Sequence, residues 1–140
     1  MDSDVSHRLS GGSAGVRTLL DAISDQLARG DVPDVATMPV LIACDEIVSN
    51  VVRHGGEARR VEVAVSVRDG LVSVEVVDDG APFDPTAADP PDVSLSVEDR
   101  DIGGLGIHLV REMMEGVAYE RRADRNHLRF SRRFARPSGS

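Results

Sequence analysis

The strongest constraint on the fold of this chain is a run of alternating residues at positions 60–77. Valine occupies every second position from Val61 to Val67 and again from Val72 to Val76, and Asp69-Gly70 separates the two runs. A period of two is typical of a β-strand with one buried face, and Asp-Gly is a preferred sequence for a tight hairpin turn. The pattern predicts an antiparallel hairpin whose other face is partly exposed and carries Glu62, Ser66, Ser73 and Glu75.

The rest of the chain predicts helices around this hairpin. Apolar spacing predicts helices at 16–29, 37–54 and 106–115, and alternation predicts a closing hairpin at 117–122 and 127–134 with its turn at 123–126. In the helix 37–54, the polar residues fall on the side opposite the apolar arc; they are Asp45, Glu46, Ser49, Asn50 and Arg53. This order of elements predicts an α+β fold, a two-layer sandwich in which helices cover one face of an antiparallel-dominated mixed sheet.

Composition narrows the class of protein. A length of 140 residues predicts one domain, here residues 8–134, between flexible segments at 1–7 and 135–140. The proline-rich and aspartate-rich stretch 84–102 predicts a lid. A formal net charge of −8 argues against direct nucleic-acid binding. The single cysteine, Cys44, is expected in the core and fits a reducing compartment. With no run of about 18 apolar residues, we expect a cytoplasmic protein without a membrane segment.

Two residues of the helix 37–54 are candidates for chemistry. Glu46 and Asn50 stand four positions apart, so their side chains project from the same face one turn apart. Mg²⁺ prefers oxygen ligands and commonly takes one or two from a protein, with the others from water and substrate phosphates. Asn50 could supply one carboxamide oxygen, and Glu46 could orient a water or accept a proton from an attacking hydroxyl. The alternative is that both lie on the solvent face of an amphipathic helix.

Two further segments could contribute to a nucleotide site. Asp78 follows a buried-looking strand, where its carboxylate could accept a hydrogen bond from an exocyclic amine such as that of adenine. Gly80 would let the backbone pass close to a ring. The segment Gly103-Gly104-Leu105-Gly106 opens a helix, where backbone N–H groups can face an anion. Taken alone, the first segment is also typical of a plain Asp-Gly turn, and the second of a lid hinge without a ligand.

In this order, the three segments resemble the N box, G1 box and G2 box of the GHKL (Bergerat-type) ATPase superfamily. Residues 45–54 read DEIVSNVVRH and residues 79–85 read DGAPFDP, and residues 103–110 are followed by Tyr119 and Asn126. The chain is most similar to bacterial anti-sigma-factor serine/threonine kinases, over roughly residues 8–134. Pro82 departs from the pattern, since many relatives carry glycine there, and a proline fixes φ and removes an N–H.

The resemblance implies a role for each matched residue. Glu46 would be the general base, and Asn50 would coordinate Mg²⁺. Asp78 would bind the adenine amine, with Gly80 beneath the ring. ATP phosphates would meet Gly104 and Gly106 beneath the 84–102 lid, with Gly103 and Leu105 in the same cofactor-binding segment, and Arg100 could contact the terminal phosphate.

The implied reaction is phosphoryl transfer from ATP to a serine or threonine of an anti-sigma-factor antagonist. The resemblance also implies binding to a sigma factor and a homodimer. Two alternatives stay open, an ATP-binding module that sequesters a regulator without phosphorylating it and a scaffold that binds no nucleotide. The sequestration module would need Asn50 but would not need Glu46 as a base.

Overall fold

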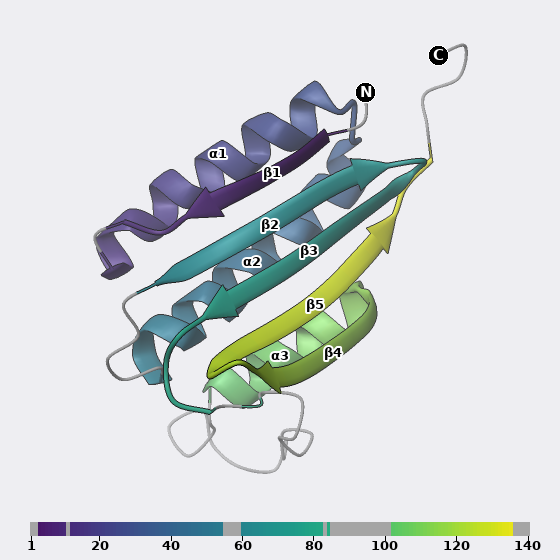
Figure 1. Ribbon diagram of the computed structural model, residues 1–140. Helices are drawn as coiled ribbons and strands as arrows, with labels where there is room; N and C mark the ends of the chain where they lie inside the picture. Colours follow the sequence, from purple (N-terminus) through teal and green to yellow (C-terminus); the bar gives the residue numbers. More distant parts are fainter. Residues whose placement is uncertain (1–2, 11, 55–59, 83, 85–101, 136–140) are drawn as a thin grey trace.

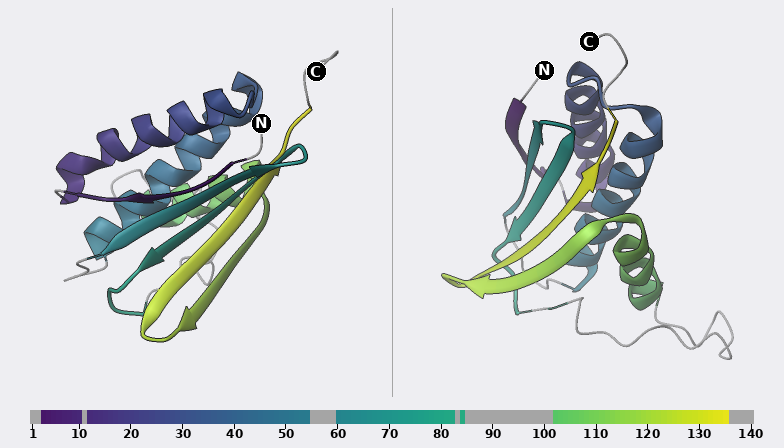
Figure 2. Two further views of the ribbon diagram at one scale, coloured as in Figure 1. Left: turned by 45° about the horizontal axis from the view of Figure 1, so that its top comes forward. Right: turned by 90° about the vertical axis from the view of Figure 1, so that its right-hand side faces the viewer.

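The computed structural model describes residues 3–10, 12–54, 60–82, 84 and 102–135, and these form a five-stranded sheet with helices on one face (Figure 1). The strands are β1 (Ser3–Arg8), β2 (Val61–Arg68), β3 (Leu71–Asp78), β4 (Glu115–Arg122) and β5 (Arg125–Arg133). The helices are α1 (Val16–Arg29), α2 (Asp34–His54) and α3 (Ile102–Met113), and a 3-10 turn, η1 (Gly12–Gly15), precedes α1. The two views in Figure 2 show the sheet and the helices as separate layers, so the predicted α+β sandwich is confirmed.

The sheet has the strand order β1-β2-β3-β5-β4, and all of its described pairings are antiparallel, whereas the sequence predicted a mixed sheet dominated by antiparallel pairs. The hairpin predicted from the valine pattern is β2–β3, in which Val65 lies opposite Val74 and both are buried. Asp69 and Gly70 have φ values of 50° and 76°, the positive values that a type I′ turn requires at both central residues. Sequence alternation and turn chemistry therefore agree on this register.

The core lies between the sheet and the helices and is mainly aliphatic. Its largest fully buried side chains come from all three helices and from β2 and β3; they are Ile23, Leu27, Val40, Cys44, Val48, Val63, Val65, Val72, Val74, Val76 and Val110. Burial raises the pKa of the Cys44 thiol to about 12, so this cysteine is a packing residue, as the sequence predicted.

The expectation of a flexible segment at residues 1–7 is wrong for Ser3–His7, which pair with β2 as part of β1. The physical reason is Gln26 of α1, a buried side chain that ties this edge strand to the helix layer. Its Nε2 donates to Val65 O at 2.8 Å and to Ser3 Oγ at 3.1 Å, and its Oε1 lies 2.7 Å from His7 Nε2. Local sequence pattern does not reveal such a clamp, because its partners lie 19 to 39 residues away from Gln26.

Helix α2 begins three residues earlier than the pattern predicted, and it contains Pro39 in its second turn. A proline has no N–H, so the carbonyl of Val35, four residues earlier, loses its usual helical donor. Arg132 of β5 donates to that carbonyl through Nη2 in a long hydrogen bond of 3.4 Å. The tertiary contact compensates in part for the proline, and the helix continues through it.

The second hairpin and the third helix also differ from their predicted bounds. Ala123 and Asp124 take φ values of 52° and 63°, so the β4–β5 turn has two residues and Asn126 belongs to β5 rather than to the turn. Helix α3 begins at Ile102 instead of position 106. Glycine costs about 1 kcal/mol relative to alanine inside a helix but does not forbid one, which is why the glycine segment was a weak boundary signal.

Two predicted segments lie largely outside the described residues. Of the predicted lid 84–102, the structure describes Asp84 and Ile102, and of the predicted tail 135–140 it describes Ala135. The division into a domain with a lid and flanking segments therefore stays a prediction at these positions.

By length and composition, α2 is the one described helix compatible with a membrane span, over Asp34–Arg53. Much of its apolar surface is buried, including Val40, Ala43 and Ile47, as in the core helix of a sandwich. Its N-terminal half nevertheless exposes a row of large apolar side chains, and they are Val35, Met38 and Ile42.

Candidate functional site

The predicted site segments gather at one end of the sandwich. In Figure 1 the C-terminal half of α2, the end of β3, the start of β5 and the first turn of α3 lie at the same end of the molecule. Helix α2 contacts both β3 and α3. The fold therefore brings together the helix that carries Glu46 and Asn50 and the strand end that carries Asp78.

Asn50 is a buried residue, 3% exposed, so the alternative that it faces solvent is wrong. At roughly 100° per residue it lies at the border of the apolar arc of α2, and tertiary packing covers it. Its Oδ1 accepts a hydrogen bond of 2.8 Å from Nη2 of Arg53. A buried carboxamide whose oxygen already accepts a hydrogen bond can present that oxygen to a ligand, since its orientation is set before any ligand arrives.

Glu46 is half-buried, and its Oε1 is buried with no hydrogen-bond partner among the described residues. Burial raises the pKa of this carboxyl above its usual range; the charge of Arg53 and the hydrogen bond to Asn50 act in the opposite direction, and Asp45 adds to the increase. A buried, unpaired carboxylate oxygen is costly to keep, and a raised pKa makes the carboxylate a better proton acceptor near neutral pH. Both properties suit a general base.

Asp78 lies at the end of β3, is 5% exposed, and accepts two hydrogen bonds on one oxygen. Its Oδ1 accepts from Gly80 N at 2.9 Å and from Asn126 Nδ2 at 3.0 Å. These contacts fix the plane of the carboxylate and leave Oδ2 able to accept from a ligand. An acceptor held this way suits an exocyclic amine, and Gly80 lies two residues further along the chain.

Sequence reasoning missed the role of Asn126 and of its partners on β4. Asn126 Nδ2 also donates to Ala81 O at 2.9 Å, and its Oδ1 accepts from the hydroxyl of Tyr119. Arg121 Nη1 donates to Gly80 O at 2.8 Å. The β4–β5 hairpin therefore holds the whole Asp78–Ala81 turn in place.

A signal for Asn126 was present in the sequence. Phe130 and Leu128 point inward from β5, and a period of two places Asn126 on the same buried face. A buried side-chain amide at the end of an apolar row needs hydrogen-bond partners. This signal was missed because the predicted turn, 123–126, wrongly included Asn126.

We expect Asn126→Ala to lower ATP affinity about tenfold and to destabilise the fold by about 1–3 kcal/mol, because it leaves the Asp78 carboxylate and the Ala81 carbonyl without this donor. Tyr119→Phe, which removes only the hydroxyl behind Asn126, should have a smaller effect in the same direction. Calorimetric titration of ATP and thermal unfolding measure both. Wild-type ATP affinity in Asn126→Ala would show that Asn126 does not position Asp78.

For the predicted phosphate-binding residues, the structure describes the backbone of the segment 103–106 but not Arg100. The backbone of Gly103, Gly104, Leu105 and Gly106 lies in the first turns of α3, where unsatisfied N–H groups can face an anion. The side chain of Leu105, and Arg100 as a whole, lie outside what the structure describes. Their contacts with phosphates therefore stay a prediction.

The donor set fits a magnesium ion held mainly by its nucleotide. Within the described ranges no group of three or more His, Cys, Asp or Glu side chains could hold a metal ion. Mg²⁺ needs few protein ligands when phosphates and water complete its octahedron, and it prefers oxygen. The buried oxygen of Asn50, beside the unpaired oxygen of Glu46, matches that requirement.

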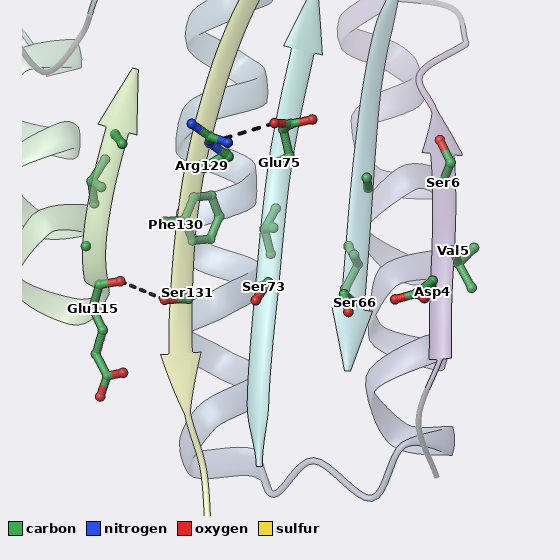
Figure 3. A pocket seen from close by; sticks show the side chains of 16 residues that line it. Asp4, Val5, Ser6, Ser66, Ser73, Glu75, Glu115, Arg129, Phe130 and Ser131 are labelled. Atoms are coloured by element: carbon green, nitrogen blue, oxygen red, sulfur yellow. Dashed lines mark hydrogen bonds and ion pairs between the residues drawn. The ribbon is translucent and has the colours of Figure 1, made fainter. Parts of the chain in front are cut away.

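A hollow of about 770 Å³ lies elsewhere, on the outer face of the sheet (Figure 3). Its floor is made of small side chains, with Ser66 opposite Ser73 and Ser73 opposite Ser131. At its edge Arg129 pairs with Glu75 at 3.8 Å. None of the predicted site residues lines this hollow, so the candidate nucleotide site is a separate feature at the end of the sandwich.

A family model for the histidine kinase-like ATPase domain matches residues 12–132, most of the chain. The chain therefore belongs to the histidine kinase-like ATPase domain family, which confirms the GHKL resemblance noted in the sequence. Membership implies ATP binding.

The chain is similar to a curated protein kinase and to a solved structure. Serine/threonine-protein kinase BtrW of Bordetella bronchiseptica (strain ATCC BAA-588 / NCTC 13252 / RB50) is 33% identical over 90 residues, an alignment that covers 62% of this chain and 63% of that protein. The chain thus spans less than two thirds of that relative. The structure of the RsbU and RsbW domains of Rv1364c from Mycobacterium tuberculosis matches 98% of this chain and 33% of that chain, with a TM-score of 0.66 and 17% identity, which shows a shared fold.

Proposed function

We propose that this chain is an ATP-dependent serine/threonine protein kinase that phosphorylates an anti-sigma-factor antagonist, and so acts in the cytoplasm as an anti-sigma factor or a related switch regulator. The observation that carries the proposal is Glu46, a half-buried carboxylate with one unpaired buried oxygen, one helical turn before the buried Asn50. The similarity to BtrW, which is named a serine/threonine-protein kinase, supports the reaction class.

Each residue then has a defined task. Asp78 accepts a hydrogen bond from the adenine amine, and the backbone at the start of α3 faces the phosphates. Asn50 offers its oxygen to a magnesium ion, which when bound neutralises charge on the phosphates. Glu46 accepts the proton of a serine or threonine hydroxyl as the new O–P bond forms and the bond from the γ-phosphorus to the bridging oxygen of ADP breaks.

The surface beside Glu46 supports a protein as the phosphate acceptor. Met38 and Ile42 are exposed on α2, and Ile42 lies one turn before Glu46 on the same face of the helix. A protein that presents a hydroxyl to Glu46 would cover this apolar surface. Binding to a sigma factor and homodimerisation, which the resemblance implies, are part of the same proposal and can be tested by ultracentrifugation with and without the partners.

Calorimetric titration of ATP, first with Mg²⁺ and then with EDTA, tests the nucleotide site. We expect magnesium-dependent binding, and we expect Asn50→Ala to lose most of the magnesium-dependent gain. Because Asn50 is buried, its truncation should also cost about 1–2 kcal/mol of stability, more than a surface change would. Ser49→Ala, one residue away, is the matched control.

The results of these titrations distinguish the kinase from the sequestration module and from a scaffold that binds no nucleotide. Equal magnesium-dependent affinity in Asn50→Ala and the wild type would remove Asn50 from the site. No ATP binding under either condition would refute the kinase and leave a member of the fold that acts by protein contact alone. Magnesium-dependent binding without phosphate transfer to any antagonist would favour the sequestration module.

A further inference from the structure

Arg53 occupies a position that the proposed reaction does not account for. It lies in the last turn of α2, three residues after Asn50 and seven after Glu46, so the three side chains share one face of the helix. Asn50 is buried whereas Arg53 is exposed, and Arg53 reaches inward to donate from Nη2 to Asn50 Oδ1 at 2.8 Å.

The oxygen that Arg53 contacts is the same oxygen that a magnesium ion would need. Mg²⁺ binds its oxygen ligands at about 2.1 Å and demands near-octahedral geometry. A guanidinium group at hydrogen-bond distance from the same carboxamide oxygen would place a second positive charge beside the ion. The two cations therefore compete for Asn50 Oδ1.

The carboxamide itself does not need to turn when the competitor leaves. Asn50 is buried, and the close packing around a buried side chain restricts its rotation, so its oxygen end stays directed toward the position that Arg53 holds. Arg53, because it is exposed, can be hydrated after it leaves. Magnesium could therefore replace the Arg53 guanidinium at the Asn50 oxygen, because the oxygen keeps its orientation and the solvent can hydrate the released guanidinium.

We propose that Arg53 is an internal cation that holds the Asn50 oxygen in the absence of metal and must release it for magnesium to bind. This inference rests on the proposed nucleotide site. It predicts that Arg53 weakens the coupling between magnesium and ATP, because part of the metal's binding free energy is used to displace the guanidinium.

The experiment is calorimetric titration of ATP into the full chain, with Mg²⁺ and with EDTA, for the wild type and for Arg53→Met. Methionine keeps an unbranched stem and a similar helix propensity but removes the charge and the donors. We expect the ratio of the ATP dissociation constant in EDTA to that in Mg²⁺ to be about three- to tenfold higher in Arg53→Met than in the wild type. The reason is that the variant lacks the charge-assisted hydrogen bond that the metal has to break in the wild type.

Two comparisons separate competition for Asn50 from a general effect of charge. Arg17→Met removes an exposed arginine from α1 and should leave the ratio unchanged. In the Asn50→Ala background, Arg53→Met should also leave the ratio unchanged, because the contested oxygen is gone. Thermal unfolding confirms that each variant is folded.

The results decide between the roles directly. An unchanged or lower ratio in Arg53→Met, with ATP still bound, would overturn the inference while the nucleotide site stands. A rise of equal size in Arg17→Met, or in the Asn50→Ala background, would overturn it in favour of long-range charge. No ATP binding by the wild type would overturn the proposed function itself, and the inference with it.

Discussion

Glu46→Gln is expected to slow phosphoryl transfer from ATP to a serine or threonine of the antagonist protein by about 100- to 10,000-fold, the range for loss of a general base. Glutamine keeps the size and polarity of the side chain but does not accept the proton. ATP affinity should stay within about threefold of the wild type, because the residues that hold the nucleotide are unchanged. Transfer of labelled γ-phosphate and calorimetric titration of ATP measure the two effects separately.

A stability measurement is the control for this substitution. The pKa of Glu46 is raised by burial, so its stabilising contribution is fully present below the unfolded pKa, about 4.3, and is lost as the pH rises through the folded pKa. At pH 7 the charged carboxylate therefore costs stability, and Glu46→Gln should be as stable as the wild type or more so. The difference should shrink as the pH falls below about 4.

The role of Glu46 can be refuted cleanly. Transfer by Glu46→Gln at the wild-type rate would show that another group accepts the proton. Asp45→Asn, the same type of change on the adjacent exposed residue, should leave the rate within about threefold. A comparable loss in both variants would point to net charge instead of a base.

Asp78→Asn is expected to weaken ATP binding by about 100-fold and to shift the preference from ATP toward inosine triphosphate. With its oxygen still accepting from Gly80 and Asn126, the new amide would present N–H where Oδ2 was. That amide opposes the adenine amine but can donate to the carbonyl of inosine. Sites that hydrogen-bond a ligand discriminate strongly against the mismatched partner, because buried polar groups are then left unpaired.

The neighbouring Asp79 provides a matched control for Asp78. Asp79 is exposed, and its Oδ1 accepts from the backbone N–H of Arg60 at 3.0 Å. Asp79→Asn changes the charge equally but should leave the ATP-to-inosine triphosphate preference at the wild-type value. An unaltered preference in Asp78→Asn would remove Asp78 from base recognition, whatever happened to overall affinity.

Local pattern was sufficient for several elements of the fold. The helical spacing of Val16, Leu19 and Ile23, with Gly30 after it, predicts a helix at 16–29, the bounds of α1 in the structure. The β2–β3 hairpin follows from alternation and from Asp69-Gly70 in the same way. In both cases neighbours within a few residues determine the backbone, because side-chain period and turn conformation are local properties.

Boundaries were predicted less well where a distant residue intervenes. Helix α2 runs through Pro39 with support from Arg132, which lies 97 residues from the carbonyl that it contacts. Strand β1 depends on Gln26, and the β4–β5 turn places Ala123, a residue with no special preference for positive φ, in the left-handed region. The contacts of Arg132 and Gln26 join residues too far apart in the sequence for a local pattern to reveal them.

The sequence by itself determined the sheet register of the central hairpin, the helix that carries Glu46 and Asn50, and the order of motifs that points to a nucleotide site. Only the tertiary structure decided that Asn50 is buried, that Glu46 keeps an unpaired oxygen, and that Asn126 completes the Asp78 turn. The reason is physical. Burial and hydrogen-bond partnership arise between groups such as Asn126 and Asp78, 48 residues apart, which come into contact only when the layers pack.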